Sequence, residues 1–171
     1  MNIQSFEIDN WEELQMGIVL DENDKWLLVK CVSEDYYTDG FCVYNKNFVL
    51  NRVNGSHERF YERVLKLKNE PLDIPSDFEF TDTIGLLKWC QNKFGLFEIQ
   101  DEDETALSIG RINSVFDTTL IIDFISSKGE VEVAHEYEFD LEEIRAVSFS
   151  SHYFNAIRLL WMDENNITST P

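Results

Sequence analysis

Histidines, cysteines and clustered carboxylates are the side chains of this chain that could do chemistry. His57 and His152 each stand just before a predicted helix, where a metal or acid–base site would need a second ligand nearby. Neither has another His or Cys at ligand spacing, so a capping or packing role is favoured. His135 lies among apolar residues of a predicted strand, and we expect it to be a hydrogen-bonded core histidine.

An acidic loop begins like a calcium site. Asp101, Asp103 and Thr105 have the alternate spacing of the first ligands of an EF-hand loop. That loop needs glycine at its sixth place and glutamate at its twelfth, and these places hold Ala106 and Ile112. The pattern therefore predicts a solvated acidic loop.

The three cysteines, Cys31, Cys42 and Cys90, match no zinc pattern. No basic residue is placed to activate any of their thiols. The seven glycines are scattered, so no phosphate-binding loop is present, and no serine stands in a nucleophile-elbow context. We therefore predict no catalytic, metal or cofactor site, and a protein that is not an enzyme.

Two features favour a partner-binding surface. Tyr36 and Tyr37 are predicted at a loop tip beside Glu34, Asp35 and Asp39, which resembles an interface anchor with an acidic rim. The alternative is a strand-end aromatic cluster, with Phe41 and Tyr44, that fills the core.

The second feature is strict alternation over residues 130–140, EVEVAHEYEFD. It predicts a half-buried strand with Val131, Val133, His135, Tyr137 and Phe139 on its inner face. Its outer row is acidic. The predicted partner-binding residues are Tyr36, Tyr37, Glu132, Glu136 and Glu138.

Charge narrows the class of partner. The 171 residues carry a net charge of −19, which repels nucleic-acid phosphates and steers basic proteins. Solubility alone is the alternative explanation. An apolar content of 43% indicates a globular chain, and no apolar run is long enough to cross a membrane. The first residues lack the pattern of a signal peptide, so we expect a cytoplasmic protein with reduced thiols.

Short strands must position these residues, and they are predicted to occur twice. Residues 17–33 align without a gap to residues 110–126 at a constant offset of 93, from Gly17 against Gly110 to Ser33 against Ser126. Phe97-Glu98-Ile99 resembles Phe6-Glu7-Ile8 at an offset of 91. The conserved spacing suggests one hairpin unit used twice.

Each copy is predicted to contain five short strands and a terminal helix. We expect a mainly β protein with a few helices, built as tandem duplicated SH3-like or Sm-like barrels. A flat antiparallel sheet and a single shared core are the alternatives. The predicted domains are a first repeat over residues 1–68, a linker and connecting helix over 69–95, and a second repeat over 96–171.

Three local signals predict helix positions. Ser56 is the predicted cap of a helix with an apolar stripe at Phe60, Val64 and Leu67, widened by Tyr61 and Leu65. Thr81 is the predicted cap of the connecting helix, and Gly95 suits its C′ position.

The second copy resembles a known group of proteins. The residues are G-R-I-x-x-V-x-x-x-x-L-x-I-x-x-I from Gly110, followed by E-F-D-L-E-E-I-R-A-V-S-F-S-S-x-Y-x-x-A-x-x-L-L. This pattern, over roughly residues 80–162, is similar to a group of uncharacterised small proteins of Gram-positive bacteria. The first copy matches more loosely and lacks the D-L-x-x-I turn. The resemblance implies common descent, fold and source, and no activity.

Together these patterns predict a cytosolic, non-enzymatic protein-interaction module. The sharper form of this prediction is an acidic inhibitor or immunity protein for a basic partner. The alternative is an Sm-like barrel that binds nucleic acid, for which the basic residues cluster only at Arg59, Arg63, Lys66 and Lys68. Exposed edge strands make a homodimer possible.

Overall fold

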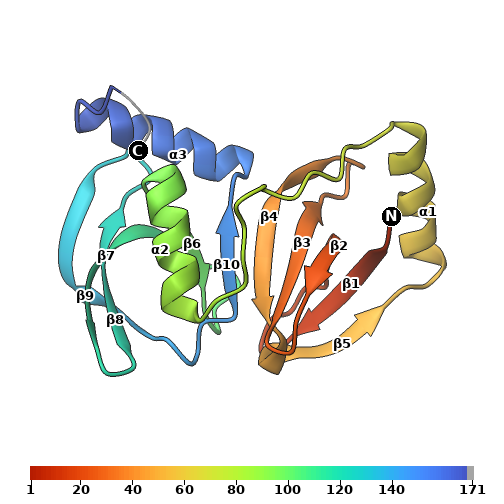
Figure 1. Cartoon of the computed structure of the whole chain (residues 1–171), viewed down its shortest axis with the longest axis horizontal. Helices are drawn as coiled ribbons and strands as arrows, with labels where there is room; N and C mark the ends of the chain where they lie inside the picture. The colour runs from red at the N-terminus through yellow and green to blue at the C-terminus, as the bar shows by residue number, and fades with distance from the viewer. Residues whose placement is uncertain (169–171) are drawn as a thin grey trace. The chain divides into compact units, whose positions relative to one another are not determined.

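The computed structural model describes residues 1–168, except for the side chains of residues 134–136. The predictions for His135 and Glu136 therefore lie outside the described residues. The chain forms two compact units, Met1–Phe80 and a second that begins at Thr81 (Figure 1). The predicted mainly β class with a few helices is confirmed.

The first unit is a five-stranded antiparallel sheet with one α-helix. The strand order is β5-β1-β2-β3-β4. A single 3-10 turn, η1, connects β4 to β5, and α1 follows β5 and packs against β1. The elements are β1 (Ile3–Ile8), β2 (Gln15–Glu22), β3 (Trp26–Val32), β4 (Thr38–Asn45), η1 (Lys46–Phe48), β5 (Val49–Val53) and α1 (Ser56–Leu67).

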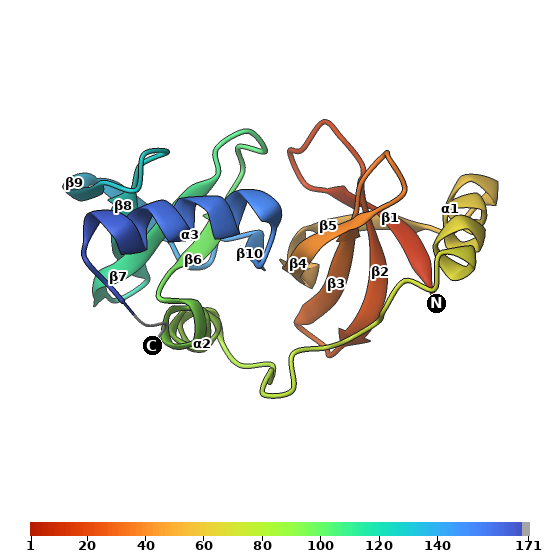
Figure 2. The ribbon, with the colours of Figure 1, turned by 90° about the horizontal axis from the view of Figure 1, so that it is seen from above.

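The second unit has the same strand order as the first. One helix precedes its five strands in the sequence and another follows them. Its antiparallel order is β10-β6-β7-β8-β9, and α2 packs against β6, β7 and β10. The elements are α2 (Thr83–Phe94), β6 (Phe97–Gln100), β7 (Ser108–Phe116), β8 (Thr119–Ile125), β9 (Val131–Asp140), β10 (Ala146–Phe149) and α3 (His152–Glu164). Figure 2 shows α2 end-on and α3 along its length. Helix α2 lies within the segment 69–95 that was predicted as a linker and connecting helix, and it belongs to the second unit.

The central hairpins of the two units share one register. In β2–β3, Gly17 pairs with Cys31 and the register slips between Val19 and Asp21. In β7–β8, Gly110 pairs with Phe124 and the register slips at the same relative place, between Ile112 and Ser114. Both glycines lie tightly against the neighbouring strand, since a Cβ would stand 3.0 Å from the Val29 side chain at Gly17 and 2.7 Å from the Asp123 carbonyl at Gly110. Residues that pair in the first hairpin therefore correspond, at the predicted offset of 93, to residues that pair in the second.

The first strand keeps that offset as well, which corrects the sequence alignment. Gly17 pairs with Gln4 in β1, and Gly110 pairs with Phe97 in β6. Phe97 therefore takes the place of Gln4, and its predicted match with Phe6 is wrong. The alignment was misled by the similarity of Phe97-Glu98-Ile99 to Phe6-Glu7-Ile8. Short strands have similar sequences, and only the pairing with a neighbouring strand fixes their register.

Helix α1 buries only part of the predicted apolar stripe. Tyr61 and Leu65, which were predicted to widen the stripe, are buried and join Ile3, Ile18 and Val32 in a core cluster. Phe60 and Leu67 are 53% and 75% exposed, so the prediction is wrong for these two residues. The helix also begins one residue earlier than expected, with Gly55 at its N-cap and Ser56 as its first residue.

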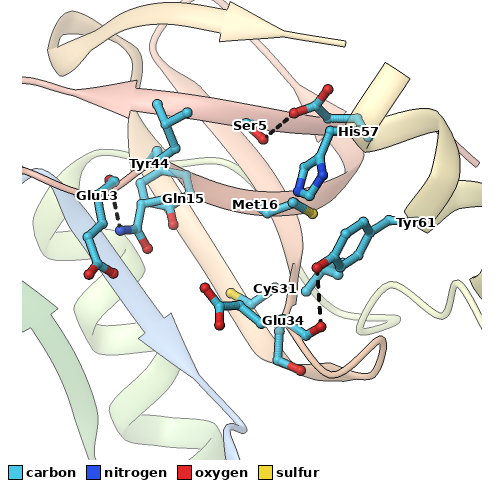
Figure 3. A pocket seen from close by; sticks show the side chains of 13 residues that line it. Ser5, Glu13, Gln15, Met16, Cys31, Glu34, Tyr44, His57 and Tyr61 are labelled. Atoms are coloured by element: carbon cyan, nitrogen blue, oxygen red, sulfur yellow. Dashed lines mark hydrogen bonds between the residues drawn. The ribbon is translucent and has the colours of Figure 1, made fainter. Parts of the chain in front are cut away.

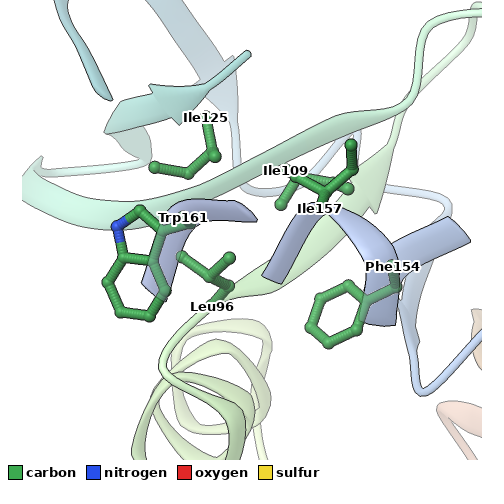
Figure 4. Packing of buried hydrophobic residues seen from close by; sticks show 6 residues of the cluster. All are labelled: Leu96, Ile109, Ile125, Phe154, Ile157 and Trp161. Carbon is green, nitrogen blue, oxygen red and sulfur yellow. The ribbon is translucent and has the colours of Figure 1, made fainter. Parts of the chain in front are cut away.

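The core of the second unit lies under α3. Figure 4 shows the six buried residues of this cluster, which come from α3, from β7 and β8, and from the residue before β6: Leu96, Ile109, Ile125, Phe154, Ile157 and Trp161. Ser151 caps α3 by accepting a hydrogen bond from the Phe154 amide at 3.0 Å. Trp161 is a core residue with 3% exposure.

Helix α2 ends as predicted and begins one residue later. Asp82, rather than Thr81, is the N-cap, and its side chain accepts from the Gly85 amide at 2.7 Å. Gly95 follows the helix with φ of 84°, the left-handed conformation that glycine adopts most easily.

Strand β9 departs from the predicted alternation. Val131 and Val133 are 39% and 71% exposed, so their predicted burial is wrong. The cause is a large register shift, because Asp123 pairs with Val133 while Ile121 pairs with Glu138. Alternation predicts one continuous inner face only where pairing is regular.

Candidate ligand pocket in the first unit

A pocket of about 740 Å³ opens in the first unit between the start of β2, the end of β3 and the first turns of α1 (Figure 3). Its size is typical of small-ligand sites. Its lining contains three glutamates, Glu13, Glu34 and Glu58, and no lysine or arginine. The pocket is therefore suited to a cationic group rather than to an anion.

The floor of the pocket is a buried hydrogen-bonded carboxylate. Glu58 is 4% exposed and accepts from the Ser5 hydroxyl at 2.7 Å and from the Gly55 amide at 2.6 Å. Burial by itself raises the pKa of Glu58, but the hydrogen bonds from Ser5 and from backbone amides outweigh it, and the pKa is lowered. Glu58 thus stays ionised and fixes the start of α1 to β1.

One wall of the pocket is aromatic. The His57 ring lies 4.8 Å from the Tyr61 ring, and Tyr36 packs on Tyr61 at 4.5 Å. The Tyr61 hydroxyl donates to the Glu34 carbonyl at 3.1 Å. Burial raises the pKa of Tyr61, and the neighbouring Tyr36 and Glu34 raise it further. Tyr61 is therefore a protonated donor that holds the loop after β3 against α1.

The loop after β3 supplies polar groups at the pocket. Ser33 and Glu34 both line it, and Glu34 is exposed. The Ser33 Oγ is buried and has no hydrogen-bond partner among the described residues. The loop itself is held by backbone bonds, in which the Ser33 amide donates to the Tyr37 carbonyl and the Tyr36 amide to the Ser33 carbonyl.

The other residues considered for chemistry do not assemble a reactive site in the part of the chain that the structure describes. There, no group of three His, Cys, Asp or Glu side chains is placed to hold a metal ion. Asp103 accepts from the amide and hydroxyl of Thr105, which lowers the pKa of Asp103, so it serves the geometry of its own loop. Among the described residues, Cys31, Cys42 and Cys90 form no disulfide, and burial raises the pKa of Cys90.

The predicted partner-binding tyrosines have different environments. Tyr36 adopts a left-handed backbone conformation with φ of 58° and packs against the Phe60 and Tyr61 rings. Tyr37 is 41% exposed. Tyr36 therefore supports the pocket wall, and Tyr37 presents its ring at the surface of the first unit.

The predicted partner-binding glutamates belong to the second unit. Glu132 and Glu138 are exposed on β9, and Glu132 accepts from the Tyr137 hydroxyl at 3.2 Å. Tyr137 in turn stacks on Phe124 at 4.4 Å. Glu136, the third of this set, lies outside the described residues.

A basic surface occurs on the outer face of α1. A hollow of about 500 Å³ is lined by Arg59, Arg63 and Lys66, with Glu62 and Leu67. Lys66 pairs with Glu62 at 2.6 Å, and Arg59 donates to the Asn54 carbonyl at 3.1 Å. Two of its three cations thus already have partners within the chain.

Comparisons with protein-family models, curated proteins and solved structures found no match to this chain. The resemblance to small proteins of Gram-positive bacteria therefore stays a prediction. Within the described residues, no helix has the length and apolar character needed to span a membrane.

Two residues of the pocket were considered in the sequence, but the pocket itself was not predicted. Glu34 was predicted as part of the acidic rim of a tyrosine loop, and His57 was considered for metal or acid–base chemistry. Ser5, Ser33 and Glu58 were missed. The spacing of Glu58 three residues after Gly55 was an available signal, since a glutamate at that position of a helix commonly binds the N-cap amide.

Proposed function

We propose that this chain is a non-enzymatic protein-interaction module whose partner is a basic protein. The observation that carries the proposal is the net charge of −19 together with the placement of the carboxylates. Of the described acidic residues, only Glu58 and Glu98 are buried. The remaining carboxylates lie at or near the surface, where they set the field that an approaching protein meets.

The sharper form of the proposal is an inhibitor or immunity protein for a basic toxin or nuclease. An inhibitor must reach its target quickly, and complementary charge raises the association rate more than it raises the affinity. The exposed glutamates of β9 and the exposed Tyr37 are the proposed contact residues. The three described cysteines form no disulfide, which supports the further proposal that the protein works in a reducing compartment, the cytoplasm.

We also propose that the two units are duplicated SH3-like or Sm-like barrels. The equal strand order, the equal register of the central hairpins and the short connection before the last strand of each unit support this. In the first unit that connection is η1, and in the second it is the turn in which the Glu143 amide donates to the Asp140 carbonyl. Such barrels commonly serve as binding modules.

Salt dependence tests the proposed partner class. The full chain is immobilised, a lysate of the source organism is passed over it, and bound protein is eluted by a salt step and identified. The purified partner is then titrated, and we expect its association rate to fall by about tenfold or more between low and high salt, because screening removes electrostatic steering. A partner that binds with a salt-independent rate, or a column that retains no basic protein in stoichiometric amount, would contradict the proposal.

A matched pair of variants tests the contact residues. E132Q/E138Q removes two charges from β9, and E102Q/D117N removes two charges from exposed loops of the same unit. We expect the β9 variant to lower the association rate at low salt more than the loop variant does. Equal effects of the two variants would assign the field to the whole surface rather than to β9.

The basic hollow of α1 favours a second candidate function, the binding of single-stranded nucleic acid by an Sm-like barrel. Arg59, Arg63 and Lys66 would contact phosphates there. Because two of these cations are already engaged and the chain is strongly acidic, we expect no change in fluorescence anisotropy when labelled mixed oligonucleotides are titrated at low salt. A saturable increase that R63A abolishes would replace the first proposal with this one.

A further inference from the structure

Resting on the proposed function, we propose that the pocket of the first unit receives one arginine side chain of the basic partner. The chemical group recognised is a guanidinium. The site is a cavity rather than the acidic surface as a whole, because the pocket combines negative charge, a ring wall and an unpartnered buried hydroxyl.

The charge of the lining selects a cation. Glu34 is exposed at the pocket, and Glu58 lies at its floor. Glu58 is 4% exposed and both of its oxygens already accept hydrogen bonds, so it contributes its field rather than a direct contact. Glu13 and Glu34 are the two exposed carboxylates of the lining, and we assign the direct contact to Glu34 because it is adjacent to Ser33.

The shape of the lining selects guanidinium over ammonium. The exposed His57 ring, which packs on the buried Tyr61 ring, provides flat, polarisable surface in the lining. The partly buried Met16 lies in the same lining. A guanidinium is planar, stacks on rings and offers its donors in a fork that matches a carboxylate. A lysine ammonium is more strongly hydrated and gains less from such a wall.

The buried Ser33 hydroxyl supplies a second acceptor. Its Oγ has no partner among the described residues, and a buried polar group without a partner destabilises a protein until something satisfies it. Ser33 is adjacent to Glu34, and both line the pocket. A guanidinium bound to Glu34 has further N–H groups that the Ser33 Oγ can accept.

Three short peptides test this selection on the full chain. They are identical except for a central arginine, lysine or citrulline, the last being nearly isosteric with arginine but neutral. Binding is followed by amide chemical shifts in NMR titrations. We expect the arginine peptide to bind about tenfold more tightly than the citrulline peptide, a ratio typical of one charge-assisted hydrogen bond. The lysine peptide should lie between them, and the shifts should centre on Ser33, Glu34 and His57.

A matched pair of variants locates the effect. E34Q removes one charge at the pocket, and E102Q removes one charge from an exposed loop of the second unit. We expect E34Q to weaken the arginine peptide by about tenfold and E102Q to leave it within about twofold. Equal binding of arginine and citrulline peptides, or equal effects of the two variants, overturns the inference.

The same variants separate this inference from the proposed function. If a basic partner binds with strong salt dependence and E34Q does not weaken it, the module has a basic partner but the pocket is not its arginine site. If the arginine peptide binds at the pocket and no basic protein is captured, the pocket is an arginine site and the proposed partner class is wrong.

Discussion

Replacing Gly129 with alanine should lower the free energy of unfolding of the second unit by about 3 to 4 kcal/mol, as the sum of backbone strain and a steric clash. Gly129 has φ of 82° in the turn between β8 and β9. A Cβ there would stand 2.5 Å from the backbone of Leu160 and Trp161. Neither partner can move cheaply, because both atoms belong to the main chain of α3.

Urea unfolding followed by fluorescence measures this effect, since Trp161 lies next to the turn and is buried in the core cluster. Lys128 is exposed in the same turn, and K128A should change the free energy of unfolding by less than about 0.5 kcal/mol. Hydrogen exchange should show faster opening of β8 and α3 in G129A, with the first unit unchanged. A G129A protein within about 1 kcal/mol of the parent would mean that α3 moves away from the turn easily.

The strands and their pairing could be predicted where the sequence repeats a whole hairpin. Gly17 and Gly110 leave room for a close neighbouring strand, and the strands that contain them pair with the next strand in the same register. Prediction failed where local patterns were compatible with two structures. The alternation over residues 130–140 does not reveal the register shift opposite Ile121 and Asp123, which is a property of two strands rather than one.

Helix α1 shows the same limit at a helix surface. Phe60 and Val64 lie on one line of the predicted stripe, and Tyr61 and Leu65 lie on a second line, one residue further along. Either line satisfies the helical period. The structure buries the second, on which Glu58 also lies. A charged residue such as Glu58 argues against burial of its side of the helix when only the sequence is known. Its burial depends on a hydrogen bond from Ser5, which is 53 residues away in the chain. The pocket could not be predicted for the same reason, since it depends on that long-range pair.

That pair provides the second large effect. We expect E58Q to lower the free energy of unfolding of the first unit by about 2 kcal/mol, because the amide oxygen of glutamine can accept only one of the two hydrogen bonds and carries no charge. With the glutamine oxygen on the Gly55 amide, its NH2 group faces the Ser5 hydroxyl, which must turn to accept, so two charge-assisted hydrogen bonds become neutral ones in a buried place. E62Q, one turn further along α1, loses only a surface pair with Lys66 and should cost about 0.3 to 0.5 kcal/mol.

The free energy of unfolding of the parent should exceed that of E58Q, and the pH dependence of this difference separates the effect of the Glu58 charge from the effect of its shape. The pKa of Glu58 is lower in the folded chain than in the unfolded chain, so its stabilisation is complete above the ordinary carboxyl pKa of about 4.3. As the pH falls through the lowered pKa, the carboxylate is protonated in the folded state and the stabilisation is lost. The difference between the parent and E58Q should therefore be constant near neutral pH and should shrink in acid. If the difference between the parent and E58Q persists unchanged in acid, the effect comes from packing rather than from charge. The difference between the parent and E62Q, measured over the same pH range, gives the baseline for a surface carboxylate.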